Sequence, residues 1–180
     1  MTMKKFLKVD EWNIIEEGFH ADNLRASESI FSLGNGRFGQ RGNFEESYSS
    51  DSLQGSYVAG ITFLDRTRVG WWKNGYPRFF SRIPNTPDWS GIYVRLIDEE
   101  LDLAHWDVES YERRLDMKAG ISYRDFRVTS PKGNTLEVHV EHINSMDNQN
   151  LCLIKYSVTS VNYEGKISLV PYLNGDVKHE

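Results

Sequence analysis

Acidic residues are the first groups in this sequence whose chemistry could be catalytic. Short acidic runs occur at Glu16-Glu17, Glu45-Glu46 and Asp98 to Glu100. Glycoside hydrolysis usually needs two carboxyl groups that flank a scissile bond. Neighbouring side chains on a strand point to opposite faces, and acidic runs near turns are usually solvated. We therefore expect none of these carboxylates to be catalytic.

Two histidines, His139 and His142, are close enough in sequence to suggest a metal site. Imidazole is the commonest ligand of transition metals in proteins. An offset of three residues, however, places two side chains on opposite faces of a strand. We expect surface or hydrogen-bonded histidines and no metal site.

Four closely spaced glycines could mark a nucleotide site. The segment from Gly34 to Gly39 matches the G-x-G-x-x-G pattern, in which glycines let the backbone approach a pyrophosphate at a helix N-terminus. The residues that follow, Gln40 to Asn43, show no helical period, so the required context is absent. We interpret the glycines as structural positions that permit positive φ or close packing between strands. They are Gly34, Gly36, Gly39 and Gly42.

An aromatic loop, residues 66–89, combines glycines, prolines, arginines and large rings. Flat rings can stack on the faces of sugars, and they can equally be buried between this domain and another one. A loop of this length is rarely a plain connection. The candidates for ligand or interface contacts are Trp71, Trp72, Tyr76, Trp89 and Arg78.

The composition excludes several classes of function. Hydrophobic residues make up 39% and charged residues 26% of the 180 residues, as in globular proteins. The net charge is −5 and the basic residues are dispersed, which argues against nucleic acid as a partner. Neither a membrane span nor a signal peptide is evident. The single cysteine, Cys152, lies in an apolar run and is predicted to be a small buried hydrophobe. We expect a cytoplasmic protein without a cofactor.

Alternating residues in the second half predict the strands that must position these groups. Leu136, Val138 and Val140 alternate with polar residues, which is typical of a half-buried strand. The run Ile121 to Thr129 precedes it, and the turn residues Ser130 to Asn134 complete a predicted hairpin. Further runs continue the pattern, so we expect an antiparallel meander. These runs are Leu151 to Thr159 and Lys166 to Leu173.

The first half contains shorter apolar runs, which we also interpret as strands. A helix of at most two turns is predicted around His20 to Ala26. Many short strands with frequent turns favour an all-β antiparallel sandwich, formed as one domain by residues 1–180. The predicted strands are Trp12 to Glu16, Ser29 to Leu33, Tyr57 to Phe63 and Ile92 to Ile97.

The segment Glu28 to Glu46 resembles the N-terminal signature of glycoside hydrolase family 65, which includes maltose, trehalose and kojibiose phosphorylases. The resemblance spans most of the chain, and the order of its motifs is more specific than any one of them. It continues through Gln54 to Gly60, Ile83 to Asn85, Arg113 to Gly120, Asn144 to Asp147 and Leu173 to Val177.

This resemblance implies a galactose-mutarotase-like supersandwich at the N-terminus of a glycoside phosphorylase or hydrolase whose catalytic (α/α)6 barrel is absent from this chain. The general acid and the inorganic phosphate that attacks the sugar with inversion belong to that barrel, so the chain by itself is expected to be noncatalytic. Its expected roles are packing on the barrel, oligomerisation as a homodimer and shaping of the site entrance. The alternatives are a free-standing carbohydrate-binding module that uses the aromatic loop, and a purely structural protein that self-associates through an exposed strand edge.

Two departures from the family pattern affect these expectations. The family's N-terminal domain is usually longer than 180 residues, so some strands of the sandwich are expected to be missing. His142 also stands where the family resemblance leads us to expect an arginine, which is expected to weaken a local ion pair.

Overall fold

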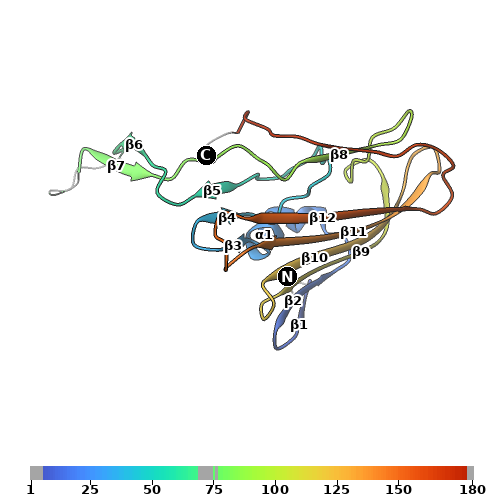
Figure 1. Cartoon of the computed structure of the whole chain (residues 1–180), viewed down its shortest axis with the longest axis horizontal. Coiled ribbons are helices and arrows are strands. Elements are labelled where there is room, and N and C mark those ends of the chain that lie inside the picture. Colours follow the sequence, from blue (N-terminus) through green and yellow to red (C-terminus); the bar gives the residue numbers. More distant parts are fainter. Residues whose placement is uncertain (1–5, 69–74, 76, 178–180) are drawn as a thin grey trace.

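A six-stranded antiparallel sheet forms one layer of the protein. The structure, a computed structural model, describes residues 6–68, 75 and 77–177. The sheet has the order β1-β2-β9-β10-β11-β12, and Figure 1 shows it as the lower layer. The strands are β1 (Leu7–Val9), β2 (Asn13–Glu17), β9 (Asp107–Asp116), β10 (Ile121–Thr129), β11 (Thr135–Asn144) and β12 (Cys152–Ser160).

The second layer is made of smaller antiparallel pieces. Strands β8 (Ile92–Arg95) and β13 (Ser168–Pro171) pair with each other above the large sheet (Figure 1). A three-stranded sheet and a short helical segment lie beside them. These elements are η1 (Ala21–Asn23), α1 (Leu24–Ile30), β3 (Leu33–Gly34), β4 (Phe38–Gln40) and β5 (Ser56–Val58).

A two-stranded ribbon extends from the body of the molecule (Figure 1). It consists of β6 (Phe63–Arg66) and β7 (Phe79–Arg82), which pair only with each other among the described strands. The two layers and the antiparallel pairing confirm the predicted all-β sandwich.

The hairpin of β10 and β11 forms as its sequence predicts. Val138 and Val140 are buried, whereas the intervening His139 is half-buried on the opposite face of the strand. Phe126 lies directly opposite Val138, so both strands present apolar residues to the core. Gly133 closes the connecting turn with a φ of +85°, which favours glycine.

The core lies between the two layers and draws on both. Fully burying an aliphatic or aromatic side chain contributes roughly 1.5–3 kcal/mol, so this cluster is the main source of stability. The large sheet supplies Tyr111, Phe126, Val128, Leu136, Val138 and Val140, and the opposite layer supplies Leu24, Phe44, Val94, Leu96, Leu101, Leu103 and Trp106.

The prediction of a strand over Ser29 to Leu33 is wrong, because most of that run belongs to α1 or the residues that end it. The helix predicted around His20 to Ala26 is present but reaches Ile30. Its buried face consists of Leu24, Ser27 and Glu28, at the helical spacing of three and four residues. Because Ser27 and Glu28 are polar, the buried face of α1 has no apolar periodicity that the sequence could reveal.

Two other strand predictions need correction, and the sequence patterns miss one further strand. The run Tyr57 to Phe63 is interrupted at Gly60, whose φ is +83°, so β5 and β6 fall in different sheets. The meander ends at β12, because β13 pairs with β8 instead. Strand β9 was not predicted, since its core-facing positions include the charged Arg113 between Tyr111 and Leu115.

No helix in residues 6–68, 75 and 77–177 combines the length and apolar character that crossing a membrane requires.

Candidate functional site

A buried ionic cluster joins the large sheet to the loop after β4. The Arg124 guanidinium, on the core face of β10, donates hydrogen bonds to Glu45 at 2.5 Å and to Glu46 at 2.6 Å. All three residues are at most 5% exposed. The phenol of Tyr156 on β12 also donates to Glu46, at 3.0 Å. The prediction that Glu45 and Glu46 are solvated is therefore wrong.

The electrostatics of this cluster keep Glu45 charged. Burial alone would raise the pKa of Glu45, but the charge of Arg124 and the nearby His142 outweigh it and lower that pKa to about 2. The Nδ1 atom of His142 lies 3.6 Å from Glu45 Oε1, an ion-pair distance rather than a hydrogen bond. Burial and the charge of Glu46 raise the pKa of Tyr156 well above its ordinary value. Glu45 is therefore not poised to donate a proton near neutral pH.

A second cluster fastens α1 to the same sheet. The Arg113 guanidinium donates to the phenol oxygen of Tyr111 at 2.8 Å and to the carbonyl oxygen of Gly42 at 2.9 Å. Glu16, 2% exposed, accepts a hydrogen bond from Ser27 of α1 at 2.9 Å. These contacts position backbone and helix, and we interpret them as structural.

The third acidic run behaves differently. Asp98 is exposed, Glu100 pairs with Arg95 at 2.8 Å, and Glu99 accepts hydrogen bonds from Ser130 and Asn134 of the β10–β11 turn. The structure thus brings none of the predicted acidic runs together as two free carboxylates facing one space.

The cavity beside the ionic cluster is too small for a sugar. Its volume is about 20 Å³, close to the space of one water molecule. Gln40 and His142 line it, and each has a buried polar side-chain atom with no hydrogen-bond partner among the described residues. We conclude that this part of the core serves packing.

Only two of the five aromatic-loop candidates, Arg78 and Trp89, lie among the described residues. Trp71, Trp72 and Tyr76 lie outside the described residues. Arg78 is exposed on the ribbon, where its carbonyl oxygen accepts a hydrogen bond from the Thr67 amide at 3.0 Å. Trp89 is half-buried, and its ring meets that of His142 edge-on with the ring centres 5.4 Å apart.

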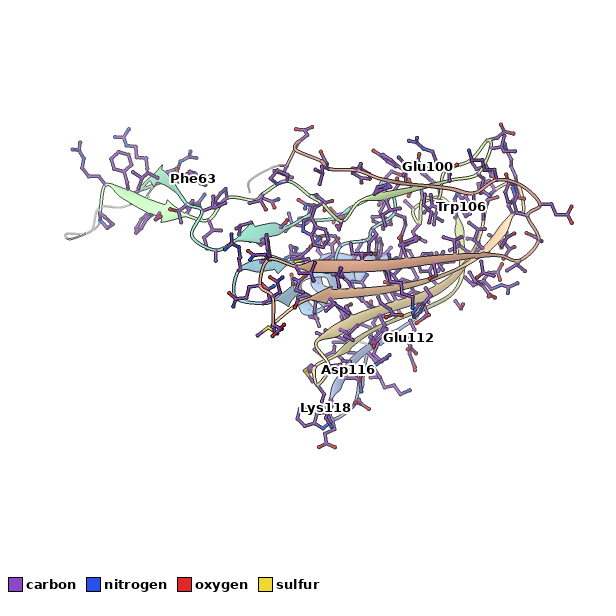
Figure 2. All side chains as sticks on the ribbon, in the orientation of Figure 1. Phe63, Glu100, Trp106, Glu112, Asp116 and Lys118 are labelled. Carbon is purple, nitrogen blue, oxygen red and sulfur yellow. The ribbon has the colours of Figure 1, made fainter. Side chains whose placement is uncertain are left out.

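Exposed apolar residues concentrate on two surfaces. The first is the ribbon, where Leu64 is 74% and Phe79 is 53% exposed; Figure 2 shows Phe63 there, far from the core. The second group lies on the edge strand β12, on β13 of the opposite layer and on the residues that flank them. Large exposed apolar patches mark interaction surfaces in many proteins. The residues of the second surface are Leu151, Leu153, Leu169, Val170 and Leu173.

Cys152 lies beside this second surface and corrects another prediction. It is half-buried rather than buried, and its neighbours Leu151 and Leu153 point outward from the edge strand. Partial burial raises the pKa of its thiol, so the thiolate is disfavoured.

Sequence comparison with known families decides which proteins these features belong to. Residues 14–180 of the chain match the family described as "Glycosyl hydrolase family 65, N-terminal domain". The chain belongs to glycosyl hydrolase family 65.

Its family 65 relatives are longer proteins. The chain is 41% identical over 180 residues to maltose phosphorylase from Bacillus subtilis, covering 100% of this chain and 24% of that protein. It is 34% identical to the α,α-trehalose phosphorylase of Thermoanaerobacter brockii, covering 99% of this chain and 23% of the relative. Thus it spans about a quarter of the length of these relatives.

A solved structure supports the same assignment. A kojibiose phosphorylase-like protein from the human microbiome superposes with a TM-score of 0.77 and 29% identity, covering 86% of this chain and 20% of that one. The likeness confirms that the sandwich is an N-terminal domain of family 65 type.

The family 65 glycines have different structural reasons. Gly36 has a φ of +86°, and a Cβ on Gly34 would lie 3.3 Å from the carbonyl oxygen of Phe38. A Cβ on Gly42 would lie 2.9 Å from Phe31. Gly39 has neither a positive φ nor an atom within 4 Å, so the proposed packing reason does not apply to it.

Sequence reasoning missed Arg124, which organises the buried cluster. Its signal was present in the alternation of Arg124, Phe126 and Val128, all of which face the core. His142 faces Glu45, so a basic residue type occupies the position where the family 65 resemblance leads us to expect arginine.

Proposed function

We propose that this chain is the noncatalytic N-terminal domain of an inverting phosphorylase that acts on an α-linked disaccharide such as maltose, trehalose or kojibiose. The observation that carries the proposal is the 41% identity to a maltose phosphorylase across the whole chain but only 24% of that relative. Inorganic phosphate is the co-substrate, and a barrel outside these residues supplies the general acid. A cytoplasmic location belongs to the same proposal.

The chemistry of the buried carboxylates supports a noncatalytic role. A general acid needs a pKa near the working pH and contact with the leaving group. Glu45 has a pKa of about 2 and is enclosed with Arg124, away from any space that a disaccharide could enter. Glu45 therefore meets neither requirement for a general acid.

The exposed apolar surfaces support a packing role. The ribbon and the surface of β12 and β13 would be costly to leave in water, and burying them against the barrel would return that free energy. We propose that the ribbon helps to shape the entrance of the catalytic site. A homodimer that buries part of the same surfaces is also part of the proposal.

An assay of phosphorolysis tests the catalytic half. The purified 180-residue chain is incubated with phosphate and with maltose, trehalose or kojibiose in turn, and released sugar phosphate is measured. The Bacillus subtilis maltose phosphorylase serves as the positive control for maltose. No release is expected from the chain alone, whereas turnover by the pure chain would overturn the proposal.

A carbohydrate-binding module is the competing function, because aromatic residues are concentrated in the loop 66–89. Calorimetric titration with oligosaccharides distinguishes the two functions. Binding that is lost in Trp72→Ala would favour the module. Binding that persists in Trp72→Ala, or none across the panel, would favour packing.

A further inference from the structure

A groove crosses the outer face of the large sheet, on the side opposite the core. It encloses about 430 Å³, within the range of small-ligand sites. Its floor is the backbone of β9, β10 and β11, whose buried residues point the other way. Figure 2 shows Glu112 on this side of the sheet. The lining side chains include Glu112, Asp125, Arg127, Glu137, His139 and Thr159.

Two chains of ion pairs hold the groove's charged groups in place. The His139 ring lies between two carboxylates, with Nδ1 2.5 Å from Asp125 and Nε2 3.1 Å from Glu141. The Arg127 guanidinium donates to Glu109 at 2.8 Å and to Glu137 at 2.7 Å. Each of these two basic side chains is thus bracketed by carboxylates on both sides, so the groups are oriented before any ligand arrives.

One carboxylate in the groove, Glu112, makes no hydrogen bond among the described residues, although it interacts electrostatically with Lys8 on β1. Glu112 lies opposite Asp125 across the β9–β10 ladder. Hydroxyl groups of Ser157 and Thr159 lie along the β12 side of the groove. The groove therefore offers both hydrogen-bond donors and acceptors, with most of its charges already paired.

The pairing of charges selects the class of ligand. A strongly charged ligand would have to compete with the existing ion pairs, while an apolar ligand would leave the polar lining unsatisfied. A sugar hydroxyl both donates and accepts, so it can bridge a carboxylate and a neighbouring donor. We infer that this groove binds an uncharged sugar of one or two residues. Only the choice of maltose and trehalose as probes rests on the proposed function.

Nuclear magnetic resonance of the isotope-labelled 180-residue chain tests the inference. Glucose, maltose and trehalose are titrated separately, and the ring signal of His139 is identified by its loss in His139→Gln. Binding in the groove should shift that signal and the backbone amides of residues 110–112, 125–127, 137–139 and 157–159. Phosphate and spermidine are the charged comparison probes.

A pair of variants locates the site. Glu112→Ala should weaken sugar binding about tenfold, the typical effect of losing one hydrogen bond to a charged group. Glu164→Ala is the control, because this exposed glutamate lies in the connection between β12 and β13 and does not line the groove. Its affinity should equal that of the unmodified chain, and both variants should retain the same amide spectrum outside the changed site.

Three results would overturn the inference: no shift with any sugar at tens of millimolar, shifts confined to the loop 66–89, or shifts produced by a charged probe alone. Equal weakening by both variants would also contradict it. None of these results bears on the phosphorolysis assay, so failure of this site and failure of the proposed function remain distinguishable.

Discussion

Arg124 links the two layers of the sandwich through its buried ion pairs with Glu45 and Glu46. Removing one partner of a buried ion pair leaves an uncompensated charge in a medium of low polarity, which typically costs about 3–5 kcal/mol. We expect Arg124→Met to lower the free energy of unfolding by about that amount, since Glu45 and Glu46 would both lose their cation. Urea denaturation measures it.

The control for this substitution lies on the same strand. Arg127 also pairs with two glutamates, but its side chain is 38% exposed, so Arg127→Met should cost at most about 1 kcal/mol. Equal losses in the two variants would contradict the assignment of the buried cluster.

Glu45 gives the protein a defined response to acid. Its pKa is lowered from 4.5 to about 2 in the folded state, so the stabilisation is complete above pH 4.5 and is lost as the pH falls towards 2. The loss is on the order of 3 kcal/mol. Glu45→Gln should be less stable at neutral pH but should lose less stability across this interval. Denaturation curves at a series of pH values test this, and parallel losses would refute it.

Gly42 and Gly39 test how closely the backbone is packed. A Cβ on Gly42 would lie 2.9 Å from both the Cβ and the carbonyl oxygen of Phe31, so Gly42→Ala should cost about 1–3 kcal/mol. Gly39→Ala, with open space around it, should be nearly neutral. The melting temperatures of the two variants decide between crowding at Gly42 and a general requirement for glycine.

At the scale of elements, the ribbon β6–β7 is the part with least support from the core. An isolated two-stranded hairpin is marginally stable in water, yet this one exposes apolar side chains. We expect the double substitution Leu64→Ser and Phe79→Ser to reduce self-association of the 180-residue chain. Analytical ultracentrifugation measures the effect, with Met117→Ser, an exposed apolar residue of the β9–β10 turn, as the control. Unchanged sedimentation of the double variant would argue against the ribbon as an interaction surface.

Sequence patterns predicted the elements whose stability is local and missed those that depend on distant partners. Strands β10 to β12 follow from alternation and tight turns, because one face of each is mostly apolar. Strand β9 and helix α1 bury Arg113 and Glu28, which are stable there only because Tyr111, Gly42, Ser52 and Leu53 supply hydrogen bonds. The buried cluster of Arg124 was missed for the same reason, since Glu45 and Glu46 are far from it in sequence.

At the scale of the whole molecule, fold and family are better determined than activity. The sandwich and the family 65 match account for nearly every described residue, whereas the chain spans only about a quarter of its relatives. The (α/α)6 barrel and its phosphate remain proposals. Of the candidate residues predicted in the aromatic loop, Trp89 and Arg78 are described by the structure. Trp71, Trp72 and Tyr76 lie outside the described residues.

The pairing of β8 with β13 has a consequence for synthesis on the ribosome. The meander from β9 to β12 contains neighbours in sequence, so it can form as it emerges, but β8 must wait for β13 to be made. During that interval the apolar face of the meander has no strand pair to cover it. This window, rather than the finished fold, is where we expect the nascent chain to need a chaperone most.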